Sequence, residues 1–236
     1  MQSFWQWQVF LREYTPGHTY LGWLMSAWGW TLSVAVCSLA LAMLLGIAVG
    51  VARTAPLRWL ALLGDAWTEL FRNIPLLVQI FLWYHVIPSV ITPLRGVPSF
   101  ALVVLALGLF TSARIAEQVK AGIQSLPAGQ RYAGLAMGLT LPQTYRYVLL
   151  PVAFRIIIPP LTSEAMSIVK NSSVAFAVSV AELTMFAMQA QEETSRGIEI
   201  YLAVTLLYFV SAFAINRVAL MIEHRVQVPG MIGSAR

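Results

Sequence analysis

The chain has 236 residues, of which 58% are hydrophobic and only 11% are charged, and its mean hydropathy is +0.73. Soluble domains carry about 25% charged residues, so this composition excludes an ordinary soluble protein and predicts an all-α integral membrane protein. The formal charge of +5 comes from basic residues scattered singly between apolar runs, which is typical of the positive-inside bias and not of a nucleic-acid-binding patch.

Residues 1–22 are predicted to form an interfacial segment on the periplasmic side. They lack a basic stretch followed by a short apolar run and a cleavage site, so we expect no cleaved signal peptide. Aromatic side chains suit the membrane interface. The candidate anchors are Phe4, Trp5, Trp7 and Phe10.

A first membrane span is predicted at 24–51, because no Lys, Arg, Asp or Glu lies between Tyr14 and Ala52 and about 20 apolar residues cross the hydrocarbon. The spacing of Gly46 and Gly50 favours close packing against another helix. Cys37, the only cysteine, excludes an internal disulfide or a cysteine metal cluster and is interpreted as a packing residue.

A second span is predicted at 73–92, where Pro75 begins or kinks a helix. Just before it, Glu69 and Arg72 have the i,i+3 spacing of a helical ion pair. His85 within the span has two interpretations, a packing residue or a proton relay.

A third span is predicted at 99–120, and its inner end carries Arg114, Glu117 and Lys120 on or near one face. One interpretation is an i,i+3 ion pair that faces the lipid headgroups. The other is a polar stripe that lines a water-filled pathway.

The segment 125–151 is mixed in polarity, and its pattern predicts two short helices joined by a turn. Ser125 ahead of Pro127 predicts a helix start, and Gly138 predicts the stop. Thr140 and Gln143 have the spacing of a capping box that opens a second short helix. We call the segment 125–151 the knob. Because it would face water, it is expected to contact a partner.

The region 148–181 is interrupted by polar residues, but the charge bias makes it a further crossing. Arg53 and Arg58 place the inner end of the first span in the cytosol, and Arg217, Arg225 and Arg236 place the C-terminus there after a last span at 200–216. An outside N-terminus and an inside C-terminus require an odd number of crossings, hence five. The same parity puts the knob in the cytosol and the acidic loop outside, with Glu182, Glu192, Glu193 and Glu199.

Glu164 and Lys170 fall at membrane depth within this interrupted crossing. A charge at a helix centre costs about 2.5–3.5 kcal/mol on insertion scales, so these residues need compensation. Pro159 and Pro160 also remove backbone donors nearby. Two interpretations remain open: an ion pair buried between subunits, or groups that line a substrate pathway.

The knob resembles the EAA loop of the membrane subunits of binding-protein-dependent ABC importers. Ala133, Gly138, Leu150 and Pro151 match the pattern E-A-A-x3-G-x9-I-x-L-P. Tyr132, Gly134 and Val148 depart from it, so the leading carboxylate is missing. The runs 69–79 and 162–173 resemble the corresponding runs of polar amino acid permeases, such as the histidine and glutamate types.

The resemblance implies a type I ABC transmembrane domain at 23–225 in the cell inner membrane, with cytosolic coupling helices between spans 3 and 4 and a cytoplasmic tail at 226–236. It implies a periplasmic amino acid-binding protein, a homologous second permease subunit or second copy, and an ATPase dimer that binds the ATP and Mg, so that this chain has no cofactor and is not an enzyme. It also suggests an acidic amino acid, glutamate or aspartate, with which Lys170 and Arg114 can pair.

The resemblance further assigns two groups of residues. The residues implied in ATPase coupling are Tyr132, Ala133, Gly134, Gly138, Leu150 and Pro151. Those implied in the substrate pathway are Arg114, Glu164, Lys170, Asn171 and Ser172.

An alternative hypothesis is an ion-coupled secondary transporter or channel subunit with Glu164 and His85 as proton-linked groups. The sequence contains no G-x-x-x-x-G-K-[ST] loop, so it predicts no nucleotide site of its own. It also shows no convincing internal repeat, which secondary transporters commonly have. The importer hypothesis is therefore favoured.

Overall fold

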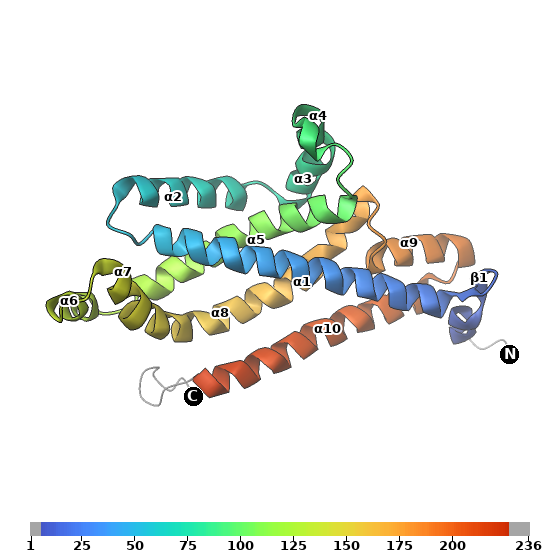
Figure 1. Cartoon of the computed structure of the whole chain (residues 1–236). Helices are drawn as coiled ribbons and strands as arrows, with labels where there is room; N and C mark the ends of the chain where they lie inside the picture. Colours follow the sequence, from blue (N-terminus) through green and yellow to red (C-terminus); the bar gives the residue numbers. More distant parts are fainter. Residues whose placement is uncertain (1–5, 227–236) are drawn as a thin grey trace.

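The computed structural model describes residues 6–226 as an elongated helical protein whose long helices lie roughly along one axis (Figure 1). The elements before the third predicted span are η1 (Trp7–Leu11), β1 (Glu13–Thr15), β2 (His18–Thr19), α1 (Tyr20–Ala52), α2 (Arg58–Asn73), α3 (Leu76–Phe81), the π-helical η2 (Leu82–Val86), α4 (Ile87–Val90) and η3 (Thr92–Leu94). The others are α5 (Ser99–Gln124), α6 (Ala128–Ala136), α7 (Leu141–Thr144), the π-helical η4 (Tyr145–Leu149), α8 (Leu150–Asn171), η5 (Ser172–Val178), α9 (Leu183–Thr194) and α10 (Gly197–Val226).

The described residues contain four helices that are long and apolar enough to cross a membrane, and five such segments if one bent pair of helices counts as a single span. The four are Tyr20–Ala52, Ser99–Gln124, Leu141–Val178 and Gly197–Glu223. The interrupted region after the knob is thus one continuous helical run, which confirms that it is long enough to be a crossing.

The candidate second crossing is longer than the predicted 73–92, because it joins α2, which begins at Arg58, to the helical run Leu76–Val90 with a bend of 101° at the break. Pro75 caps α3, and Ile74 is extended with φ −93° and ψ 128° because a proline disfavours helical backbone in the residue before it. Because α2 contains charged residues, a hydropathy scan does not detect it as part of a membrane span. Figure 1 shows α2 alongside α1 and α5, with α3 and α4 turning away.

Close packing between α1 and α5 forms the centre of the bundle. A Cβ at Gly46 would lie 2.6 Å from Ile115 Cβ, and one at Gly50 would lie 2.5 Å from Val119 Cβ. These glycines bring the two backbones together, as their spacing predicts. Close van der Waals packing therefore holds α1 against α5 along the inner half of the membrane.

The segments predicted to lie outside and those predicted to lie in the cytosol are found at opposite ends of the bundle. The N-terminal hairpin and α9 lie at one end, and α6, α7 and the end of α10 lie at the other (Figure 1). At the outer end, the Gln6 backbone N–H donates to Glu199 Oε1 at 2.8 Å and the Tyr20 hydroxyl donates to Glu193 Oε2 at 2.7 Å. The acidic loop thus holds the N-terminal segment in place.

The predicted interfacial anchors are only partly described. Trp7 is exposed and Phe10 is buried in the outer cluster around α9. Phe4, Trp5, Arg236 and the tail from 227 lie outside the described residues.

Glu182 caps α9 and is fully buried against Tyr208 of α10, so it is not part of an exposed acidic loop as the sequence predicts. Its carboxylate accepts hydrogen bonds from the backbone N–H groups of Thr184 and Met185 and from the Tyr208 hydroxyl. Burial raises the pKa of Glu182, and these hydrogen bonds oppose the shift. Glu182 therefore holds the segment that connects α8 with α10 against α10.

Replacing Gly50 by alanine tests the α1–α5 contact. The added Cβ would also lie 2.9 Å from the Ala116 carbonyl oxygen, so one backbone has to shift. We expect a destabilisation of about 1–3 kcal/mol, typical of overpacking, measured as a lower thermal midpoint in detergent. Gly29→Ala is the matched control on the same helix, since nothing lies within 4 Å of its Cβ position. Equal midpoints for the two variants would contradict the close packing.

Candidate coupling surface and membrane polar cluster

The first helix of the knob is α6, and it begins later than the sequence predicts. Ser125 is the C-cap of α5 and its hydroxyl donates to the Gly122 carbonyl at 2.8 Å. Pro127 is the N-cap of α6. The prediction of a helix start at Ser125 is therefore wrong, because α5 continues to Gln124 and its last turn uses the serine hydroxyl.

Gly138 and Gly134 define how α6 ends and packs. Gly138 has φ +84°, the left-handed conformation that its position predicts. A Cβ at Gly134 would lie 2.7 Å from Thr144 Cγ2. The glycine that stands where the EAA pattern has alanine thus lets α6 approach α7 closely.

The second helix of the knob is the beginning of the fourth membrane span. The Gln143 amide oxygen accepts from both the backbone N–H of Thr140, at 2.8 Å, and its hydroxyl, at 3.0 Å, as expected of a capped start. From Leu141 the chain then runs without a break through η4 into α8. The prediction of two separate short helices is therefore corrected, since α7 is joined rigidly to a helix that crosses the membrane.

Leu150 and Pro151 lie at the start of α8, at the C-terminal end of the knob. Leu150 is half-buried and packs on the inner core cluster, while Pro151 is exposed. The knob is also attached to the α1–α2 connection, where the Tyr145 hydroxyl donates to the Thr54 carbonyl at 2.6 Å. A force on α6 would therefore reach both α8 and α1.

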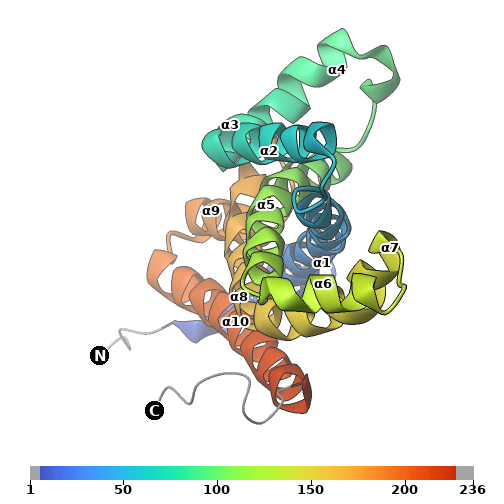
Figure 2. The same cartoon turned by 90° about the vertical axis from the view of Figure 1, so that its left-hand side faces the viewer.

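The outer face of α6 and the turn after it is apolar and exposed. We define the coupling surface as Tyr132, Ala133, Leu135 and Met137, of which Tyr132 is 68% and Met137 85% exposed. Figure 2 shows α6 protruding at the end of the bundle that faces the viewer. Apolar side chains gathered at the cytosolic end are typical of a protein–protein contact.

At membrane depth, Arg114 of α5 and Glu164 of α8 form a bidentate ion pair. Arg114 Nε lies 2.8 Å from Glu164 Oε2 and Arg114 Nη2 lies 3.0 Å from Oε1. The Gln118 amide adds a third donor at 2.9 Å. Glu164 is buried and its carboxylate is fully engaged, so its charge is compensated within the chain.

Lys170 does not join this pair. It is exposed on α8 and has no hydrogen bond or ion pair to any described residue. Asn171 is half-buried beside it, and Ser172 is buried with its hydroxyl donating to the Val169 carbonyl at 2.7 Å. The ion pair of Glu164 is thus formed within the chain, with Arg114 of α5, and not between subunits as one interpretation held. Lys170 remains available.

The polar residues at the inner end of α5 form contacts with other helices and not the predicted i,i+3 pair. Glu117 Oε1 lies 2.9 Å from Arg53 Nη2, and Lys120 Nζ lies 3.1 Å from Asp65 Oδ1. Arg53 Nε also lies 2.6 Å from Asp65 Oδ1. The sequence does not reveal this network, because its members come from α1, α2 and α5.

The two remaining polar predictions concern α2 and η2. Arg72 Nη2 lies 3.3 Å from Glu69 Oε1, as the i,i+3 spacing predicts. His85 is exposed and its ring contacts Phe81 and Tyr84. No hydrogen bond or ion pair between described residues links His85 to Glu164, which the secondary-transporter hypothesis pairs with it.

Residues 42–228 match the family of binding-protein-dependent transport system inner membrane components. The chain belongs to this family. A permease of such a system spans the inner membrane, so membership favours the importer hypothesis over the ion-coupled secondary transporter.

Individual relatives extend this family assignment to amino acid permeases. The chain is 43% identical to the glutamate/aspartate import permease protein GltJ of Escherichia coli K12, over 97% of this chain and 98% of that protein. It is 32% identical to the glutamine transport system permease protein GlnP of the same organism, over 84% of this chain and 90% of that protein.

Solved structures agree with the fold. A crystal structure of an amino acid ABC transporter with histidines matches with a TM-score of 0.77 and 29% identity, over 87% of this chain and 95% of that one. The inward-facing methionine ABC transporter MetNI matches with a TM-score of 0.76 at 22% identity, covering 87% of this chain and 97% of that one, and shows the fold alone.

Replacing Arg114 by glutamine tests the membrane ion pair. Glu164 would keep a buried charge with only the Gln118 amide as donor, and because the Arg114 side chain is 44% exposed the expected cost is about 1–3 kcal/mol. The expected result is a fall in the thermal midpoint in detergent. The double variant Arg114→Gln, Glu164→Gln should recover most of it, and Arg58→Gln, at an exposed arginine, serves as the control. An unchanged midpoint for Arg114→Gln would show that the pair contributes nothing.

Proposed function

We propose that this permease subunit imports acidic amino acids, glutamate or aspartate, and that a separate ATPase dimer moves it by gripping the coupling surface. The near full-length similarity to GltJ supports the substrate class. A periplasmic amino acid-binding protein would deliver the substrate, and a second permease subunit or second copy would complete the pathway. In this proposal the ATPase binds ATP and Mg, and this chain performs no covalent chemistry.

The observation that carries the coupling role is the rigid connection of α6 to the membrane. Gly134 brings α6 onto Thr144, α7 continues into α8, and Tyr145 links the knob to Thr54. A displacement of α6 would thus be transmitted to the helix that carries Glu164 and Lys170. The family's leading carboxylate is replaced by Tyr132, so in this chain the contact would rest on apolar burial and not on that charge.

Gly138→Val tests the coupling element. A branched side chain at φ +84° is strained by roughly 1–2 kcal/mol or more, so the turn that positions α6 should change. We expect normal membrane insertion but loss of most substrate-stimulated ATP hydrolysis in the reconstituted complex.

Gly129→Val is the matched control for this variant. Gly129 also has free space around its Cβ position but lies in α6 without a positive φ. Full coupling in Gly138→Val, or equal loss in both variants, would contradict the proposed role of the turn.

The substrate pathway would run along the polar face of α8. Lys170 offers an uncommitted cation, and Asn171 adds an amide next to it. An acidic amino acid carries two carboxylates, and a lysine can pair with one of them. Arg114 is engaged with Glu164, so in the state described here its role is to hold α5 and α8 together.

Lys170→Gln should reduce glutamate and aspartate uptake by at least tenfold and leave assembly with the ATPase intact, because the variant removes the charge without opening a cavity. Uptake of radiolabelled substrate into proteoliposomes measures the effect. Lys170→Arg keeps the charge and should retain most uptake. If Lys170→Gln transports both substrates normally, Lys170 does not contact them.

A further inference from the structure

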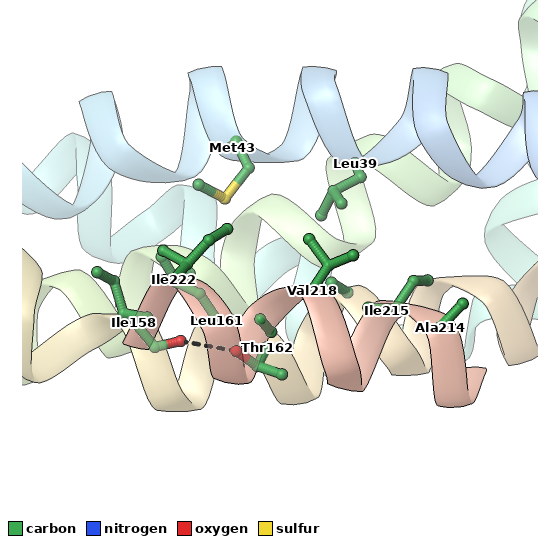
Figure 3. A pocket seen from close by; sticks show the side chains of 11 residues that line it. Leu39, Met43, Ile158, Leu161, Thr162, Ala214, Ile215, Val218 and Ile222 are labelled. Atoms are coloured by element: carbon green, nitrogen blue, oxygen red, sulfur yellow. Dashed lines mark hydrogen bonds between the residues drawn. The ribbon is translucent and has the colours of Figure 1, made fainter. Parts of the chain in front are cut away.

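A deep apolar groove lies between α1, α8 and α10, on the side of α8 that the proposed coupling and pathway do not use. α8 forms its floor, while α1 and α10 form its walls (Figure 3). The inner part has a cavity volume of about 540 Å³ and includes Leu39, Met43, Leu161, Val218 and Ile222. The hydroxyl of Thr162, which also lines it, donates to the Ile158 carbonyl at 3.2 Å, so the groove presents no unsatisfied hydroxyl.

The groove continues toward the outer half of the membrane. A second cavity of about 340 Å³ shares Leu39, Ala165 and Ala214 with the first and extends to Trp28 and Val210. From Val210 to Ile222, α10 rises about 18 Å at 1.5 Å per residue. One leaflet of a bilayer with a hydrocarbon core of about 30 Å is about 15 Å thick. The groove is therefore as long as an extended acyl chain of one leaflet.

The size of the groove fits an acyl chain better than an inserted helix. A helix segment about 10 Å wide and 18 Å long occupies roughly 1,400 Å³, more than either cavity holds. A single acyl chain is much narrower and matches the apolar lining. The small side chains Ala165, Ala214 and Ala219 leave the space that it would fill.

The cytosolic mouth of the groove carries two arginines. Arg225 lies one helical turn beyond Ile222 on α10, and Arg155 lies one turn before Ile158 on α8, toward the cytosol. Both arginines are exposed, and neither has a hydrogen bond or ion pair with a described residue. Two guanidinium groups beyond the cytosolic end of an apolar slot complement a phosphate with an attached acyl chain.

We propose that the groove binds one acyl chain of an anionic phospholipid from the cytosolic leaflet, whose phosphate is held by Arg225 and Arg155. The lipid would fill the space between α1 and α10, which otherwise have few contacts with each other. It would thereby fix the position of α10 against α8. This inference concerns lipid binding and does not depend on the identity of the transported substrate.

Native mass spectrometry of the full chain in nanodiscs of phosphatidylglycerol and phosphatidylcholine tests the proposal. The wild-type chain should retain one phospholipid after release from the nanodisc, with phosphatidylglycerol favoured several-fold. Ala214→Phe, and the milder Ala214→Leu, should lose that lipid because their side chains occupy the groove. Arg225→Gln should lose the preference for phosphatidylglycerol.

Controls separate a specific site from general lipid binding. Arg217→Gln removes a cation of the same helix that stacks on Phe213, and Leu206→Phe enlarges an exposed side chain outside the groove. Both should retain the lipid and its preference. Equal lipid retention in Ala214→Phe, Ala214→Leu and the wild-type chain would overturn the proposal. A disulfide between the Val218→Cys side chains of two copies of a Cys37→Ser chain would also overturn it, because protein and not lipid would then cover the groove.

Discussion

The whole arrangement depends on α5, which is packed on several sides by other helices. Gly46 and Gly50 let it pack closely on α1, and Gly122 brings it so close to α8 that an added Cβ would overlap the Ile157 side chain. The Arg114–Glu164 pair joins the same two helices at membrane depth. Because lipid offers no hydrogen bonds, these contacts must satisfy each polar group within the protein. α5 is therefore the fixed element against which α8 and the knob are positioned.

The placement of charges separates structural from functional groups. Glu164, Asp65 and Glu117 all have cations from other helices within the chain, so their charges stabilise the bundle. Lys170 is different, since it stands exposed on α8 without a partner among the residues described. A residue of this kind within a span is expected to face another subunit, water or substrate. The proposed import function favours the last two of these environments.

Much of the fold was predictable because it follows from local patterns. Charge-free runs predicted α1 and α5, the arginine bias predicted the topology, and Gly138 predicted the left-handed turn. These features depend on composition and on backbone conformation, which are visible in a short window of sequence.

The remaining features depend on contacts between distant segments. The partner of Glu164 is 50 residues away along the chain, and nothing in the spacing of Arg114, Glu117 and Lys120 shows that each pairs with a different helix. The start of the second crossing was missed because α2 contains charges that α1 and α5 neutralise. Ser125 was misassigned because α5 continues past its apolar part. The groove between α1 and α10 likewise exists only in the packed structure.

The central claim is that an external ATPase acts on α6 at the cytosolic face. The most direct measurement is cross-linking from Ala133→Cys, in a Cys37→Ser chain, within the assembled complex in membranes. Our account predicts that this cysteine reacts with impermeant reagents only from the cytosolic side and forms cross-links to the ATPase subunit that change with bound nucleotide. Labelling from the periplasmic side, or no cross-link to the ATPase in any nucleotide state, would contradict it.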